Sequence, residues 1–467
     1  MDIKTDSEFK KDFIDLLNLF YGDNLPFEIS HEEWIDAGEI RNVFIIKNGT
    51  ERKYEKRYYI DENLPELRKK SLRKRNAKNL LYTILCEQSG KTLPWGALTG
   101  VRPSKFARDL IENGECKEYL IVETLASEYG VSIEKAKLAR RIIKNQKCII
   151  RNDKLVDLYI NIPICPTRCL YCSFISSEIK KVENILDDYL RCLVKELNAV
   201  KKLVADKAYI IRTIYIGGGT PSVLSPLQLD MLLSNITYPV SEFTVECGRP
   251  DTITREKLEI LKRHKVTRIS INPQSFCEST LKRIGRAHKN QDVINAYALA
   301  LEFGFDINMD IIAGLPGEKL GIFKRTMSRL LEFYPENITV HTLSIKNGAN
   351  LRDSKSEYEF GDVNSMLNYA QKVLDENGYE PYYIYRQKNQ LGGLENVGYF
   401  RDKKVCIFNV DSMEDATSII GIGAGAISKR VYNIENRIER EPNCKFIEDY
   451  IARIDVMIDK KIKFFNW

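Results

Sequence analysis

The feature that most constrains the fold is a sixfold alternation of short β-branched segments and amphipathic helical segments between residues 153 and 350. The predicted strands span residues 155–162, 211–217, 242–247, 266–272, 305–314 and 337–344, and the predicted helices span residues 183–200, 226–236, 255–264, 292–304 and 323–333. Strands that alternate with helices form parallel sheets, and right-handed crossovers place the helices outside. Because a closed barrel of this kind needs eight units, six units predict an α/β fold with a partial (β/α)6 TIM-like barrel.

Accessory segments flank this barrel. Residues 1–152 mix helical patterns with alternating apolar and polar residues around Asn48-Gly49, a dipeptide typical of a hairpin turn, and a helix is predicted to begin near Ser104. Beyond residue 350 the periodicity weakens, and residues 379–400 are dense in aromatic, amide and basic side chains. We expect an N-terminal α+β accessory domain over 1–152, the barrel over 153–350 and a C-terminal substrate-side domain over 351–467.

The composition indicates a globular protein with no membrane span. The 467 residues are 43% hydrophobic, which is enough for two or three cores, and no run approaches the roughly 18 apolar residues of a spanning helix. Residues 1–13 contain no apolar signal segment, so we expect a cytoplasmic location. The net charge is only +6, and the basic stretch Arg68–Lys78 lacks interleaved aromatic residues. We therefore expect no nucleic-acid partner and interpret that stretch as a solvated helix face.

Three of the eleven cysteines form a tight cluster directly after the first barrel strand. Cys165, Cys169 and Cys172 have a C-x3-C-x2-C spacing and lie at the end of the barrel where such folds build active sites. Three thiolates on one loop can bind a [4Fe–4S] cluster and leave one iron open for chemistry. The alternatives are a zinc site, which needs a distant fourth ligand, and a redox pair of Cys169 and Cys172, which leaves Cys165 unexplained.

Glycine and polar residues follow the other predicted strands. The loop after the second strand comprises Gly217, Gly218, Gly219 and Thr220. Glycines allow the backbone to approach a ligand closely, although a tight βα turn favours them as well. Polar side chains recur at or after the next strand ends, at Glu246, Gln274, Arg286 and Asp310. The carboxylates can hold ribose hydroxyls and the guanidinium can face a carboxylate, whereas each residue alone is equally consistent with a salt bridge or a cap.

The cysteine loop resembles the signature of the radical S-adenosylmethionine superfamily, C-x3-C-x-Φ-C, in which Φ is aromatic. Cys165, Cys169 and Cys172 match its cysteines, and Tyr171 matches its aromatic residue. The resemblance implies a [4Fe–4S] cluster whose open iron is chelated by S-adenosylmethionine. It also implies electron transfer that cleaves this cofactor to methionine and a 5′-deoxyadenosyl radical, while the protein positions the cofactor and excludes water.

Longer segments are similar to one branch of this superfamily, the oxygen-independent coproporphyrinogen III oxidases or dehydrogenases. They lie between residues 155 and 430 and include LYINIPICPTRCLYCSF, IYIGGGTPS, RISINPQSF and MDIIAGLPGE. The segments LPWGALTGVRP and IYRQKNQLGGLENVGYF resemble a subgroup with an N-terminal extension. The resemblance implies cofactor contacts from Tyr159, Tyr171, Phe174, Gly217, Gly218, Gly219, Thr220, Glu246, Gln274, Arg286 and Asp310.

The branch resemblance also implies a reaction. A hydrogen atom is abstracted from the β-carbon of a propionate, and loss of CO2 and an electron then leaves a vinyl group. Two such rounds convert coproporphyrinogen III to protoporphyrinogen IX in haem synthesis. The expected partners are a tetrapyrrole substrate and a reduced flavodoxin or ferredoxin-type electron donor. A tetracarboxylate substrate calls for cationic anchors in an apolar cavity, and the candidates are Arg386, Lys388, Lys429 and Arg430.

Two departures from the branch pattern point in opposite directions. Ser173-Phe174 stands where the oxidases carry a fourth cysteine one residue beyond the third ligand, and Phe174 is typical of haem-chaperone relatives. Those chaperones carry a His-Asn-x-x-Tyr-Trp motif, whereas the corresponding run here begins with Glu395 and lacks the histidine proposed to ligate haem. The alternatives are therefore a haem-binding delivery protein and a radical enzyme acting on another tetrapyrrole, such as a methyl-transferring haem degrader.

Overall fold

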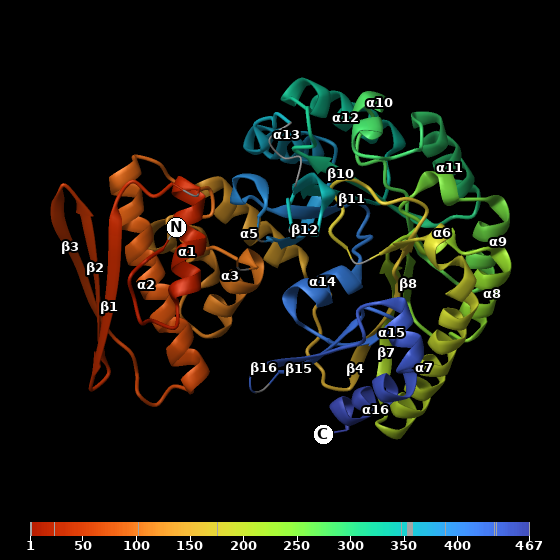
Figure 1. Ribbon diagram of the computed structural model, residues 1–467, viewed down its shortest axis with the longest axis horizontal. Coiled ribbons are helices and arrows are strands. Elements are labelled where there is room, and N and C mark those ends of the chain that lie inside the picture. Colours follow the sequence, from red (N-terminus) through yellow and green to blue (C-terminus); the bar gives the residue numbers. More distant parts are fainter. Residues whose placement is uncertain are drawn as a thin grey trace. The chain divides into compact units, whose positions relative to one another are not determined.

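The computed structural model describes residues 2–22, 24–100, 102–174, 176–346, 348–352, 358–387, 389–433, 435 and 437–466. The chain divides into two compact units, one of residues 1–140 with 392–394 and one of residues 141–391 with 395–467. Figure 1 shows their helices and strands in chain order. The division falls within α5 (Ile133–Asn145), upstream of the expected boundary at residue 152, because the helical pattern runs across it.

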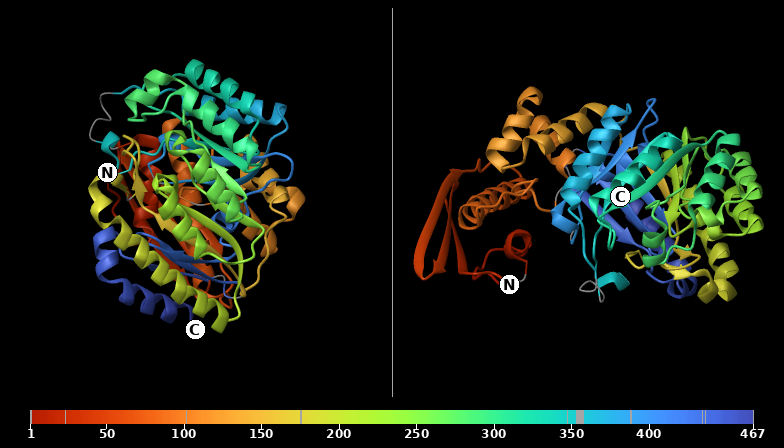
Figure 2. Two further views of the ribbon diagram at one scale, coloured as in Figure 1. Left: turned by 90° about the vertical axis from the view of Figure 1, so that its right-hand side faces the viewer. Right: turned by 90° about the horizontal axis from the view of Figure 1, so that it is seen from above.

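The N-terminal unit contains a three-stranded antiparallel sheet in the order β1 (Glu28–Asp36), β2 (Glu39–Asn48) and β3 (Thr50–Tyr59). Figure 2 shows helices against one face of this sheet only. α1 (Lys10–Tyr21) and α2 (Glu66–Ser89) pack on the sheet, and the unit also contains α3 (Pro103–Glu112) and α4 (Ile121–Tyr129). Gly49 closes the β2–β3 hairpin with a φ of +71°, as the sequence predicts. The basic stretch lies on α2, where Arg73 pairs with Glu33 and Arg75 with Glu115.

The larger unit is built around one eleven-stranded sheet. The six predicted barrel strands pair parallel in it as β4 (Leu155–Ile162), β7 (Ile210–Gly218), β8 (Glu242–Val245), β9 (Arg268–Ser270), β10 (Asp306–Ala313) and β11 (Asn337–Thr342), all within the predicted segments or one residue beyond them. Helices α7 (Leu186–Asp206), α8 (Pro226–Ser234), α9 (Arg255–Arg263), α10 (Glu278–Arg283), α11 (Asn290–Glu302) and α12 (Leu320–Phe333) follow these strands. They form an outer layer on the convex side of the sheet (Figures 1 and 2), so the predicted α/β class and partial barrel are confirmed.

Residues 351–467 extend the same sheet at both ends. At one end, β13 (Asn396–Phe400) pairs antiparallel with β11, and β12 (Glu380–Tyr385) pairs with the outer side of β13. At the other end, β14 (Ser418–Ile422) pairs parallel with β4, and β15 (Ile427–Tyr432) and β16 (Arg437–Pro442) continue the sheet beyond it. The remaining helices are α13 (Val363–Glu376), α14 (Ile407–Glu414), α15 (Ile447–Ala452) and α16 (Ile454–Phe465). The segment expected as a C-terminal domain thus shares one sheet and one compact unit with the barrel.

The barrel strands alternate apolar and polar residues. On β10, Ile307 and Met309 are fully buried, and the intervening Asn308 and Asp310 line a cavity on the concave side. On β11 the same period of two places Thr339 and His341 in this cavity, and Glu246 lines it directly after β8. The concave side of this sheet is therefore polar along its length rather than filled with branched apolar side chains.

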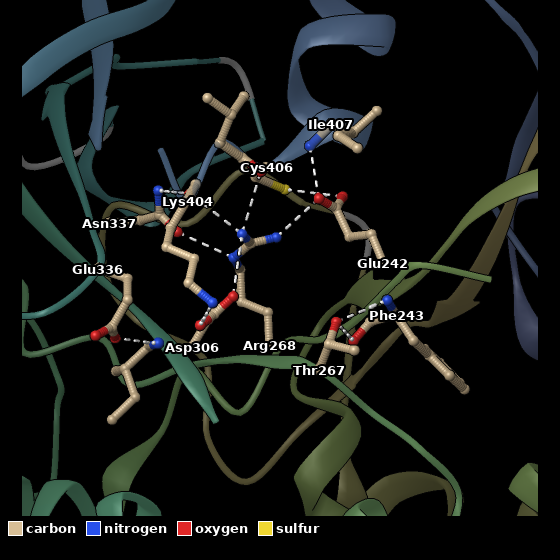
Figure 3. A network of polar contacts seen from close by, with 12 residues as sticks. Glu242, Phe243, Thr267, Arg268, Asp306, Glu336, Asn337, Lys404, Cys406 and Ile407 are labelled. Carbon is tan, nitrogen blue, oxygen red and sulfur yellow. Dashed lines mark hydrogen bonds and ion pairs between the residues drawn. The ribbon is translucent and has the colours of Figure 1, made fainter. Parts of the chain in front are cut away.

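A buried network of ion pairs and hydrogen bonds joins the amino ends of β8, β9, β10 and β11 (Figure 3). Arg268 on β9 is 3% exposed; its Nη1 lies 2.9 Å from Oε2 of Glu242 on β8, and its Nε donates to Asn337 Oδ1 at 2.9 Å. Glu242 also accepts the backbone N–H groups of Ile407 and Phe408, at 2.7 and 2.9 Å. One carboxylate therefore joins the barrel to the N-terminus of α14 and satisfies that helix's unpaired donors.

A second buried carboxylate gives a pH prediction. Asp157 on β4 is fully buried, and it accepts a 2.7 Å hydrogen bond from Thr213. Burial raises the pKa of Asp157 above its usual 3.8, so the folded chain holds a proton that the unfolded chain releases as the pH rises. This group's contribution to stability is present below pH 3.8 and falls as the pH rises through the raised pKa. Asp157→Asn keeps the acceptor, so we expect its unfolding midpoint to exceed that of the parent by about 2–4 °C at pH 9 and by a smaller margin at pH 5, which lies between the unfolded and the folded pKa of Asp157. Equal midpoints of the two proteins at both pH values, followed by circular dichroism, would rule this out.

Candidate functional site

The carboxyl ends of the barrel strands open into a cavity of about 340 Å³. The cysteine loop, the glycine loop and the strand-end polar residues all line it. The predicted residues brought together there are Cys165, Cys169, Tyr171, Cys172, Phe174, Gly218, Gly219, Thr220, Glu246, Gln274, Arg286 and Asp310. Tyr159 and Gly217 do not line it.

The cysteine loop is held in place by backbone pairing. β5 (Ile164–Cys165) pairs with β6 (Ser177–Glu178), the Leu170 N–H donates to Ile284 O at 2.9 Å, and the Leu170 carbonyl accepts the Leu351 N–H at 3.0 Å. Burial raises the pKa of Cys165, and it raises the pKa of Cys172 to about 11, with further contributions from the neighbouring cysteines. Burial and mutual repulsion therefore disfavour the thiolate forms of these cysteines. A bound iron cation stabilises those thiolates, so the environment suits an iron site.

The glycine loop leaves no room for side chains. Gly218 has a φ of +104°, and a Cβ there would lie 1.8 Å from Asn161 Oδ1. A Cβ on Gly219 would lie 2.5 Å from the Ile164 carbonyl oxygen, beside the cysteine loop. Bare backbone is therefore required where the loop faces the cavity, and such backbone can hydrogen-bond a ligand's polar groups.

Two polar atoms around the cavity are buried and have no hydrogen-bond partner among the described residues: Gln274 Oε1 and Arg286 Nε. Gln274 is 7% exposed and has a φ of +63°. Arg286 is held at its other nitrogens, because Nη1 donates to the Gly248 and Asn272 carbonyls, both at 3.1 Å. Buried groups without partners are rare and costly. The unpartnered atoms of Gln274 and Arg286 therefore fit a bound polar cofactor, and the three converging thiols fit an iron–sulfur cluster beside it.

Glu246 fixes the geometry of the glycine loop. Its Oε1 accepts the Tyr215 hydroxyl at 2.6 Å, and its Oε2 accepts the Gly218 N–H at 3.3 Å. Burial, with a smaller contribution from the nearby Asp310, raises the pKa of Glu246 to about 7. Asp310 itself accepts from Asn272 Nδ2 at 2.8 Å and faces His341 Nε2 at 3.5 Å. The two carboxylates therefore form a ready set of acceptors for hydroxyl groups.

Tyr159 lies one layer behind the cavity. Its hydroxyl donates to Asn161 Oδ1 at 3.0 Å, and its ring stacks on Tyr215 with the ring centroids 6.2 Å apart. Asn161 in turn donates to the Ala424 carbonyl and lies against Gly218. Tyr159 thus supports the glycine loop through Asn161. The sequence resemblance implied that Tyr159 contacts the cofactor, whereas its side chain does not line the cavity.

The expected substrate anchors lie elsewhere. Lys429 pairs with Asp415 at 3.0 Å, and Arg430 donates to the Phe464 carbonyl at 3.0 Å; both are on β15, two strands beyond β4, and neither lines the cavity. Arg386 does not line it either, and burial lowers the pKa of its guanidinium to about 10. Lys388 lies outside the described residues.

Sequence reasoning missed several cavity residues. Arg249, 3% exposed, donates to Thr167 Oγ1 at 3.0 Å and pairs with Asp251, so it ties the end of β8 to the cysteine loop. Its position three residues after Glu246 is the signal that could have found it. The other missed residues include Arg168, Tyr215, His341, Lys346, Tyr385, Asn409 and Met413.

The fold agrees with comparisons with known proteins. The family model described as the radical SAM superfamily matches residues 159–330. The oxygen-independent coproporphyrinogen-III oxidase-like protein HemZ of Bacillus subtilis is 37% identical over 417 residues, covering 86% of this chain and 83% of the relative. The chain belongs to the coproporphyrinogen-III oxidase-like family of radical SAM proteins. Radical SAM proteins use a [4Fe–4S] cluster and S-adenosylmethionine.

Two further relatives define the breadth of this family. The heme chaperone HemW of Escherichia coli is 30% identical over 285 residues, covering 59% of this chain and 70% of the relative. The solved coproporphyrinogen III oxidase HemN of Escherichia coli, described as a radical SAM enzyme, has a TM-score of 0.53 at 20% identity and covers 68% of this chain and 73% of its own. The structural similarity to HemN supports the fold assignment. No helix in the described part of the chain is long and apolar enough to cross a membrane.

Gly218→Ala is expected to weaken S-adenosylmethionine binding at least tenfold. The methyl group would collide with Asn161 Oδ1 on a backbone with positive φ, so the loop must move off Glu246. Equilibrium dialysis with labelled cofactor measures this on the reconstituted protein. Gly321→Ala is the matched control, since a Cβ there meets nothing within 4 Å. Equal affinities for the parent and both variants would show that the loop does not cradle the cofactor.

Proposed function

We propose that this chain is a radical S-adenosylmethionine oxidoreductase that converts propionate side chains of coproporphyrinogen III to vinyl groups, giving protoporphyrinogen IX. The observation that carries the proposal is one cavity that combines a three-cysteine loop, a glycine cradle and a polar wall. The 37% identity to an oxidase-like relative over most of both chains supports the choice of substrate class.

In this proposal Cys165, Cys169 and Cys172 hold the cluster, and the Gly218–Gly219 backbone with Glu246 holds S-adenosylmethionine. When bound, the cluster and cofactor supply hydrogen-atom abstraction. Gln274 Oε1 offers its free acceptor to the cofactor. Arg249 holds the cysteine loop through Thr167, and Arg286 joins the segments that follow β8 and β9. Asn409 and Met413 of α14 also line the cavity and help to exclude water.

The electron balance requires an outside acceptor. Each propionate loses one β-hydrogen atom, CO2 and one electron as the vinyl group forms, so a one-electron acceptor is needed for every turnover. A reduced flavodoxin or ferredoxin-type protein is the proposed donor for cofactor cleavage.

A haem-binding delivery protein is the second candidate. Phe174, 64% exposed beside Cys172, and the heme chaperone relatives favour it. Glu395 argues against it, because the position of the chaperones' histidine here holds a carboxylate side chain that is 1% exposed and does not line the cavity.

Anaerobic incubation of the reconstituted protein with coproporphyrinogen III, reductant, S-adenosylmethionine and a one-electron acceptor separates the two candidates. The proposal predicts products that have lost one and then two CO2 units, detected by mass spectrometry after oxidation to porphyrins. Cofactor cleavage without any vinyl product would reject the oxidase. Tight haem binding with a Soret shift in the same preparation would then favour the delivery protein.

A further inference from the structure

Among the described residues, four cationic side chains line the cavity: Arg168, Arg249, Arg286 and Lys346. The guanidinium groups are already engaged. Arg168 Nη2 donates to the Gly348 carbonyl at 2.6 Å, Arg249 pairs with Asp251 at 3.0 Å, and Arg286 donates to backbone carbonyls at 3.1 Å. These three guanidinium groups bond to neighbouring residues of the cavity lining, so few of their N–H donors remain for a ligand.

Lys346 differs from these three. It lies in the loop that follows β11, its side chain is half-buried, and no hydrogen bond or ion pair joins its ammonium to any residue in the described part of the chain. Burial lowers its pKa, while the nearby Cys172 acts in the opposite direction. A half-buried ammonium without a counter-charge is costly, and a carboxylate partner relieves that cost.

The cavity that Lys346 lines suits one carboxylate-bearing side chain of a macrocycle. Apolar Leu343, Ile312 and Met413 line the same cavity, as do the polar Gln387 and Ser344. A cavity lined both by apolar side chains and by an ammonium that has no ion pair in the described part of the chain fits a flat, largely apolar ring that carries a carboxylate on a short chain.

We propose that Lys346 is a specificity-determining residue that binds a propionate carboxylate of the tetrapyrrole. This inference rests on the proposed function and names the cation that replaces the anchors expected from the sequence. A carboxylate is also present on S-adenosylmethionine, so the experiment must separate the two sources.

The test is titration of the reconstituted, cluster-containing protein with coproporphyrin III, the stable oxidised form of the substrate, followed by its Soret absorbance. Lys346→Met is expected to bind about tenfold more weakly, equivalent to about 1.4 kcal/mol, and Lys346→Arg is expected to stay within about threefold of the parent because it keeps the charge. Lys202→Met, which removes an exposed lysine from α7, is the matched control and should bind like the parent. Unchanged cluster absorbance in all variants shows that they are folded.

The other outcomes overturn the proposal in distinguishable ways. If the parent binds coproporphyrin III and Lys346→Met binds equally well, Lys346 is not an anchor and the proposed function stands. If Lys346→Met loses affinity for S-adenosylmethionine in equilibrium dialysis while porphyrin affinity is unchanged, the lysine serves the cofactor. If the parent itself binds no coproporphyrin III, the proposed function fails together with this inference.

Discussion

Cys169→Ala is expected to yield a colourless protein that neither retains four irons nor cleaves S-adenosylmethionine. Cys165, Cys169 and Cys172 are the thiols that line the cavity, and the loop between them is pinned by Leu170 to the segment after α10. A cube with three thiolate ligands cannot keep its iron–sulfur core when one ligand becomes a methyl group. Iron and sulfide analysis, visible absorbance and chromatography of 5′-deoxyadenosine measure the effect on protein reconstituted anaerobically.

The matched control for this variant is Cys192→Ala. Cys192 lies on α7 outside the cavity, so its removal should leave iron content and cofactor cleavage at the level of the parent. A Cys169→Ala protein that still holds four irons and cleaves the cofactor would show that another group completes the cluster.

Glu242→Ala is expected to lower the free energy of unfolding of the larger unit by about 3–5 kcal/mol. The substitution leaves Arg268, 3% exposed, without its nearest carboxylate and removes the acceptor from two N–H groups at the start of α14 (Figure 3). A buried charge that loses its partner keeps its desolvation penalty, which is why the effect exceeds that of a surface pair.

Chemical unfolding monitored by circular dichroism measures this loss. Glu242→Gln keeps an acceptor for one N–H group, so it should recover part of the stability. Glu441→Ala breaks an exposed pair with Lys460 at 3.7 Å and is expected to change stability by less than about 1 kcal/mol. If Glu242→Ala were as mild as Glu441→Ala, the buried network would not hold α14 to the barrel.

The barrel and the cysteine loop were predictable from sequence because their signals are local. The segment 155–162 coincides with β4, since a strand buried in a parallel sheet is a short apolar run. The three cysteines fall within eight residues, so their convergence depends on one loop. The convergence of Glu246, which directly follows β8, and Asp310, in the second half of β10, was predictable because the carboxyl ends of parallel strands meet at one edge.

The remaining features depend on packing that local patterns do not encode. β14 is an apolar strand like the others, yet it pairs with β4 from more than 250 residues away, so no local pattern predicts that it joins the barrel. Lys346 and Arg249 are ordinary loop cations until the chain brings them to the cavity. The concave-side polar residues of β10 and β11, such as Asn308 and His341, had a readable signal in their alternation with apolar neighbours, which sequence reasoning used only at the strand ends.

Electron paramagnetic resonance of the reduced protein, recorded before and after addition of S-adenosylmethionine, tests most directly whether Cys165, Cys169 and Cys172 leave one iron open to this cofactor. We predict a [4Fe–4S] signal whose g-values shift when the cofactor is added, because its amino and carboxylate groups bind that iron. A [4Fe–4S] signal that the cofactor leaves unchanged, or an anaerobically purified protein that contains zinc in place of iron and sulfide, would contradict this assignment.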